Sequence, residues 1–201
     1  ELSSLQMPAQ LRALLDPDLR TAETGLAGLA GALDGLGAGT LQLTAGGGRD
    51  GTYPVCRAAD AARVPTDCAD SLIRLTLTAD RAGHLVCLTL DEAGRFFVIL
   101  PAAYAPDVRL SQGAALTLPE ALPPQAGGNR IYWPAMGPPA ETLIACLLYR
   151  GVPAPLTAGL SRLDGTRLTG PDLRALLALL RDGAPLAAAA TRVRITDGRS
   201  R

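Results

Sequence analysis

Hydrophobic and polar residues alternate through the middle of the chain, as they do in half-buried β-strands. Three such stretches, "SLIRLTLTAD", "GHLVCLTLD" and "GRFFVILP", follow one another between residues 71 and 101 and are separated by "DRAG" and "DEAG". Because short turns of this kind join neighbouring antiparallel strands, we expect a three-stranded meander. Further strands of the same kind are predicted at residues 115–118, 129–135 and 141–150.

Both ends of the chain show helical spacing instead. Residues 1–37 carry leucines three or four positions apart on a segment rich in glycine. The later leucines of this stripe are Leu26, Leu29, Leu33 and Leu36. An interior glycine costs a helix about 1 kcal/mol relative to alanine, so this helix needs a surface to pack on. Near the other end, "TGPDLRALLALLRDGAP" predicts a helix with Thr169 as N-cap and Gly183 as C-cap.

Shorter patterns fill the connections. Leu41 and Leu43 alternate with polar residues ahead of the glycine-rich "AGGGRDG", which predicts a strand followed by a loop. A short helix is expected at residues 57–64, and "TRVRIT", residues 191–196, is expected to be a final edge strand.

Six short core strands with glycine and proline at their turns leave no room for crossover helices. The sequence therefore predicts a mainly β fold, an antiparallel β-sandwich that is Ig-like or an open barrel, with N-terminal helices and one C-terminal helix. We expect residues 1–65 to form a helical segment with a loop and strand that pack on the core, residues 66–155 to form the sandwich, and residues 156–201 to form a linker, the C-terminal helix and the edge strand.

Charge and composition exclude several classes of binding partner. The 19 basic and 19 acidic residues balance, and no basic cluster precedes the short tail "TRVRITDGRSR", so neither nucleic acid nor an anionic lipid surface is an expected partner. No apolar run approaches the ~20 residues of a membrane helix, so membrane insertion is not expected. The absence of lysine is typical of a GC-rich bacterial genome. The chain starts at Glu1 without a leader, which predicts a fragment of a longer protein or one that has lost a signal peptide.

Residues with catalytic chemistry are few. His84 is the one histidine, it begins a strand beside Gly83, and no G-x-S-x-G motif surrounds a serine. Asp91 and Glu92 fit the "DEAG" turn for backbone reasons. "AGGGRDG" lacks the Lys-Ser/Thr pair of a phosphate-binding loop. The sequence predicts no enzyme, no cofactor and no metal site.

The four cysteines have no close pair of the kind that binds zinc. Their even number suits either two disulfides in an oxidising compartment or four buried thiols. Cys56 and Cys68 flank a short polar, alanine-rich loop segment, and a bridge there would stabilise the fold by about 3 kcal/mol.

Residues 70–150 resemble the bacterial family named domain of unknown function 4384. The resemblance is carried by "HLVCLTLDEAG", "VILPA", "PDVRLSQGAALTLP" and "TLIACLLY" in this order and spacing. It implies an all-β module attached to other domains, often in envelope-associated, kinase-like or caspase-like proteins, with no activity assigned to it. It also places Cys87 and Cys146 at family cysteine positions in two core strands, where they either form a disulfide or are small buried hydrophobic residues.

The segment "RIYWPAMGPP" combines Arg130, Tyr132 and Trp133 with prolines, a composition typical of interface hot spots. We therefore expect a non-catalytic protein-interaction or scaffold module of a bacterial cell-envelope or secreted protein, in the periplasm or outside the cell, that binds another protein. One alternative is a cytoplasmic regulatory appendage of a kinase-like or caspase-like protein. The other is a small-ligand or glycan-binding domain, in which His84, Asp91, Arg95 and Trp133 would converge in one cleft.

Overall fold

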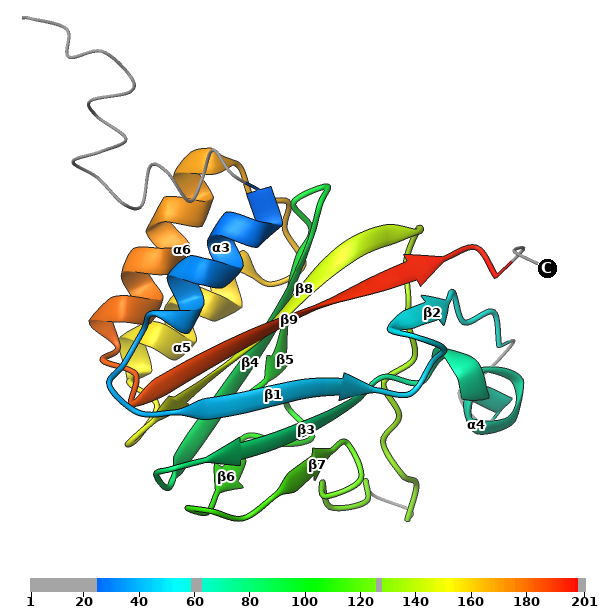
Figure 1. The fold of residues 1–201 in the computed structure, drawn as a ribbon, viewed down its shortest axis with the longest axis horizontal. Helices are drawn as coiled ribbons and strands as arrows, with labels where there is room; N and C mark the ends of the chain where they lie inside the picture. Colours follow the sequence, from blue (N-terminus) through cyan, green and yellow to red (C-terminus); the bar gives the residue numbers. More distant parts are fainter. Residues whose placement is uncertain (1–24, 59–62, 126–127, 199–201) are drawn as a thin grey trace, which may run out of the picture.

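The computed structural model describes residues 25–58, 63–125 and 128–198, which form three layers (Figure 1). The helices are α3 (Gly25–Asp34), α4 (Val64–Asp67), α5 (Ala154–Leu163) and α6 (Gly170–Asp182), with a 3-10 turn η2 (Ala69–Ser71). The strands are β1 (Leu41–Gly46), β2 (Thr52–Pro54), β3 (Arg74–Ala79), β4 (Gly83–Asp91), β5 (Phe96–Leu100), β6 (Arg109–Leu110), β7 (Leu116–Leu118), β8 (Ala140–Tyr149) and β9 (Ala187–Thr196). The predicted mainly β, antiparallel sandwich or open barrel is confirmed.

A six-stranded sheet forms the middle layer, in the order β2-β9-β8-β4-β5, with β6 paired to the start of β4. Neighbouring strands are antiparallel except β2 and β9, which are parallel. Its central strands β4 and β8 are buried along most of their length. Alternate residues of β4 therefore pack in opposite directions: Cys87 lies in the cluster with the second sheet, and Leu88 lies in the cluster with the helices.

The second sheet, in the order β1-β3-β7, covers one face of the first (Figure 1). Leu75 and Leu77 of β3 are fully buried against Cys146 and Leu148 of β8. The two sheets meet where the amide of Gly39, just before β1, donates to the Leu186 carbonyl, just before β9, over 2.8 Å. The sandwich is thereby curled towards a partly closed barrel.

Helices α3, α5 and α6 cover the opposite face of the six-stranded sheet (Figure 1). The glycine-rich α3 packs Leu29 and Leu33 against the sheet beside Ala188, and the Asp34 carboxylate accepts the Ala190 amide over 2.9 Å. Small residues on both sides allow this close packing, which supplies the surface that the glycine-rich helix was expected to need. Helical structure was also predicted for residues 1–24, which lie outside the described residues.

Helix α6 begins and ends where its sequence predicts. Thr169 is the N-cap, Gly183 is the C-cap, and the Asp172 carboxylate accepts the Thr169 amide over 2.8 Å. Hydrogen bonds from the Thr169 side chain and backbone lower the pKa of Asp172. At the end of β8, buried Tyr149 donates its hydroxyl to the Leu180 carbonyl over 3.1 Å, and burial raises the pKa of this tyrosine. The hydrogen bond ties α6 to the central sheet.

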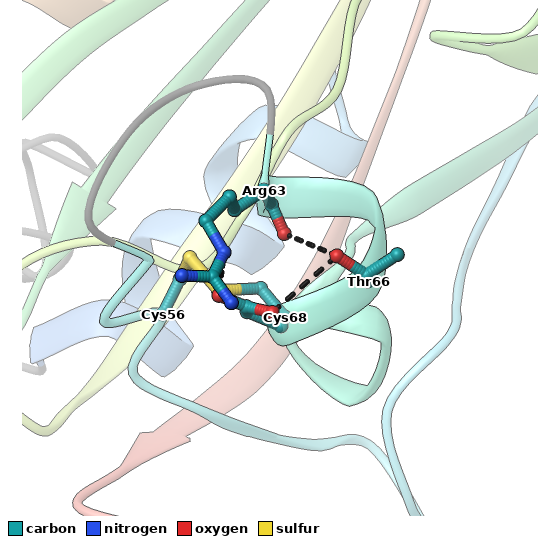
Figure 2. Close-up of a disulfide and its surroundings, with 5 residues drawn as sticks. Cys56, Arg63, Thr66 and Cys68 are labelled. Carbon is teal, nitrogen blue, oxygen red and sulfur yellow. Dashed lines mark hydrogen bonds and ion pairs between the residues drawn. A yellow bond between two sulfur atoms is a disulfide. The ribbon is translucent and has the colours of Figure 1, made fainter.

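Both candidate disulfides are present, so the alternative of four buried thiols is wrong. Cys56 and Cys68 are joined across 12 positions of sequence, beside α4. Figure 2 shows the Arg63 guanidinium beside this bond, and Arg63 Nε lies 3.1 Å from an Asp67 carboxylate oxygen. Cys87 and Cys146 face each other in β4 and β8 as a fully buried cross-strand pair. Two disulfides indicate an oxidising compartment rather than the cytoplasm.

Several predicted pairings are wrong. β4 and β5 form the expected hairpin, but β3 belongs to the second sheet, because "DRAG" is a crossover between sheets rather than a tight turn. "NRIYWPA" forms no strand, since its only sheet-type pairing is the single bridge between Leu72 and Pro134. The expected edge strand at "TRVRIT" is the second half of β9, which lies inside the sheet with β2 on its outer side.

Two helices differ from their predictions. α4 starts at Val64, later than the expected helix at residues 57–64, of which residues 59–62 are not described. The expected linker after residue 155 instead contains most of α5. Pro153 and Pro155 suggest that regular secondary structure ends here. Proline is nevertheless favourable in the first turn of a helix, because an amide at that position would have no intrahelical partner.

We expect Leu33→Ala to lower the free energy of unfolding by about 2–5 kcal/mol, because it removes a fully buried side chain between α3 and the sheet. Leu26→Ala, in the half-buried first turn of α3, is the matched control and should cost less. Urea unfolding measures both. Equal losses would contradict the packing of α3 on the sheet.

Candidate functional site

The described chain exposes three large hydrophobic side chains, two of which line the same hollow. Phe97 is 51%, Tyr132 37% and Met136 66% exposed. Phe97 and Met136 line one hollow with Ile73 and Pro134. Ile73 also lines a second hollow with Tyr132, and Pro134 lines a third hollow with Tyr132. We call these five residues, Ile73, Phe97, Tyr132, Pro134 and Met136, the apolar face.

Backbone hydrogen bonds on both sides of Pro134 fix this segment to the segment that contains Ser71 and Ile73. The Trp133 carbonyl accepts the Ile73 amide, and the Ala135 amide donates to the Ser71 carbonyl, each over 2.8 Å. Trp133 is half-buried and donates its Nε1–H to the Tyr104 hydroxyl over 3.3 Å. The neighbouring Tyr132 side chain is left exposed, so one aromatic ring anchors the segment and the other is presented to solvent.

One hollow beside Tyr132 has a volume of about 440 Å³ and is lined by Arg74, Glu120, Arg130 and Trp133. Arg74 Nε lies 2.7 Å from a Glu120 carboxylate oxygen, which pairs the charges at its rim. Arg130, Tyr132 and Trp133 all line this hollow, and their binding role stays a prediction.

A second hollow, which we call the end cavity, lies where β4 ends and where β5 and β8 begin, and has a volume of about 310 Å³. Its polar lining residues are Thr89, Asp91, Arg95 and Thr142. The Asp91 carboxylate accepts the amides of Ala93 over 2.9 Å and Arg95 over 2.8 Å, and it pairs with Nε and Nη2 of Arg95. Its expected backbone role in the "DEAG" turn is confirmed, and it also fixes the arginine.

His84 lies at the other end of β4, seven residues or about 23 Å from Asp91. Its Nδ1 is 2.5 Å from an Asp107 carboxylate oxygen, and Arg109 Nε is 3.5 Å from the other oxygen. The hydrogen bond with His84 is the largest cause that lowers the pKa of Asp107. The single cleft of His84, Asp91, Arg95 and Trp133 is therefore not formed, although Arg95 and Trp133 lie in neighbouring hollows.

Sequence reasoning did not select Phe97, Met136 or Ile73. Phe97 could have been found, because strand alternation buries Phe96 and turns its neighbour outward. Ile73 and Met136 are brought to Phe97 only by the crossing of distant segments, which no local pattern reports.

Within residues 25–58, 63–125 and 128–198, no group of three or more histidine, cysteine, aspartate or glutamate side chains is arranged to hold a metal ion. None of the helices in this part of the chain combines the length and apolar character that crossing a membrane requires.

Comparisons with protein-family models, curated proteins and solved structures found no match to this chain. The resemblance of residues 70–150 to domain of unknown function 4384 stays a prediction.

We expect His84→Gln to raise the pKa of Asp107 towards its ordinary value of about 3.9, because the main stabiliser of the carboxylate is removed. Carboxyl-carbon NMR during a pH titration measures the shift. Arg109→Gln is the control and should give a smaller rise, since Arg109 is a lesser cause. A larger rise for Arg109→Gln than for His84→Gln would show that the histidine bond is not dominant.

Proposed function

We propose that this chain is a non-catalytic protein-interaction module of a bacterial cell-envelope or secreted protein, and that the apolar face contacts its partner. The observation that carries the proposal is the exposure of Phe97 and Met136 around one hollow and of Tyr132 around two hollows that share Ile73 or Pro134 with it. Contiguous exposed apolar side chains on a soluble fold are typical of protein interfaces. Arginine and tyrosine beside them, here Arg130 and Tyr132, are the residue types enriched in binding hot spots.

The electrostatics of the region agree with a protein partner. Arg74 is paired with Glu120 and Arg95 with Asp91, so the face presents neither a basic stripe nor an acidic one. Phosphate backbones require clustered unpaired cations, whereas protein interfaces combine an apolar centre with paired charges at the rim.

The two disulfides support a place in the periplasm or outside the cell, where such bonds persist. The resemblance to domain of unknown function 4384 agrees with the same proposal, because it implies a module attached to other domains, often in envelope-associated, kinase-like or caspase-like proteins, with no activity assigned to it.

Site-specific photo-crosslinking tests the partner surface. With p-benzoyl-phenylalanine at position 136, we expect one discrete adduct in envelope or secreted fractions of the source bacterium. The matched control places the same group at position 175, on the exposed side of α6. Tyr132→Ala should lower the adduct from position 136 by at least about tenfold, since it removes a hot-spot side chain. Equal adducts from positions 136 and 175, or none from 136, would refute the proposal.

A further inference from the structure

The lining of the end cavity is mostly apolar with a few polar residues. Its apolar lining includes Ile73, Phe97, Pro134 and Met136 of the apolar face. Its polar lining consists of Thr89, Thr142 and the Asp91–Arg95 pair. A mostly apolar hollow with a few converging polar groups is the usual form of a binding site.

Asp91 pairs with one edge of the Arg95 guanidinium and leaves the other edge, with Nη1, directed away from it. Nε and Nη2 pair with a single Asp91 oxygen. Nη1 lies beside Gly137, 3.8 Å from the position that a Cβ would occupy there. Gly137 has a φ of 92°, which favours glycine, and its lack of a side chain leaves this edge of the guanidinium uncovered.

The charge balance selects the ligand. A guanidinium offers only donors, so the group that Arg95 binds must be a hydrogen-bond acceptor. Asp91, whose side chain is 8% exposed, already neutralises the arginine. A second carboxylate would leave an uncompensated negative charge beside a buried one, whereas a neutral carbonyl keeps the balance.

The volume of the end cavity and the residues that it shares with the apolar face favour a peptide as its ligand. A volume of about 310 Å³ is at the lower end of the range for small-ligand sites, which suits one large side chain with its flanking peptide groups. Phe97, Pro134 and Met136 belong to both the cavity and the apolar face, so a chain bound on the face passes over the opening. Methionine at the rim adapts its shape to different side chains.

We propose that the end cavity binds one large apolar side chain of an extended peptide segment of the partner, and that Arg95 Nη1 donates to a backbone carbonyl of that segment. This inference rests on the proposed protein-interaction function and names the chemistry that the apolar face recognises. Thr89 and Thr142 are placed to bond the peptide amides that flank the side chain.

The test uses N-acetyl-phenylalanine methylamide as the probe, with the whole chain labelled with 15N. We expect saturable NMR shifts at the amides of Thr89, Met136 and Thr142 and at Arg95 Nε–Hε. N-acetyl-glycine methylamide, which lacks the side chain, should leave these signals unchanged. N-acetyl-phenylalanine with a free carboxylate should bind about tenfold more weakly than the methylamide.

Two variants separate the contributions. Arg95→Lys keeps a cation for Asp91 but loses the second guanidinium edge, and it should weaken probe binding about tenfold. Thr142→Val keeps the shape of the cavity and should weaken binding by a smaller factor. Ala175→Ser, on the exposed side of α6, is the control and should leave probe affinity unchanged. Tyr132 lies outside the end cavity, so Tyr132→Ala should weaken probe binding less than Arg95→Lys does.

The outcomes distinguish this inference from the proposed function. No shifts at the cavity residues with millimolar probe, or tighter binding of the carboxylate, would overturn the inference. If crosslinking from position 136 then persists, the protein-interaction function stands without it. Probe binding that Tyr132→Ala weakens as much as Arg95→Lys would also overturn it, since the probe would then lie on the open face.

Discussion

The burial of β4 and β8 on both faces is the constraint on which the rest of the structure depends. A sheet whose central strands are apolar in both directions needs a layer on each side. Here β1, β3 and β7 cover one face and α3, α5 and α6 the other. The Cys87–Cys146 disulfide joins the two central strands within the core that faces the second sheet, where both cysteines are fully buried.

Because both faces of the six-stranded sheet are covered, another strand could reach it only at its edges. The outer edge of β5 is already occupied, because its Val98 amide donates to the Asp164 carboxylate over 2.9 Å and its Phe96 amide to the Thr166 carbonyl over 3.0 Å. An edge satisfied in this way does not recruit another strand. A partner is therefore expected to contact side chains such as Phe97, Tyr132 and Met136 rather than to extend the sheet at β5.

The elements with their own periodicity or caps were predictable from the sequence. Strand alternation located β4, β5 and β8, and the Thr169 and Gly183 signals located α6. Which strands pair with one another could not be predicted from the sequence, because an alternating strand such as β3 is equally suited to either sheet. The alanine run at the start of β9 has low strand propensity and hid a strand that only its position between β8 and β2 explains.

The candidate site was predictable to a similar degree. The aromatic and arginine residues near Tyr132 are close in sequence, so composition identified them. The end cavity joins Ile73, Arg95 and the stretch from Met136 to Thr142, which are three separate segments, and only the crossing of the two sheets brings them together.

The central claim is that double-sided burial holds the fold and leaves the apolar face free for a partner. Urea unfolding of the triple variant Phe97→Ser, Tyr132→Ser, Met136→Ser tests it most directly. Exposed substitutions typically change stability by about 0.5 kcal/mol or less each, so the account predicts a total loss below about 1.5 kcal/mol. A loss of several kcal/mol would show that these side chains are part of the core and would contradict the account.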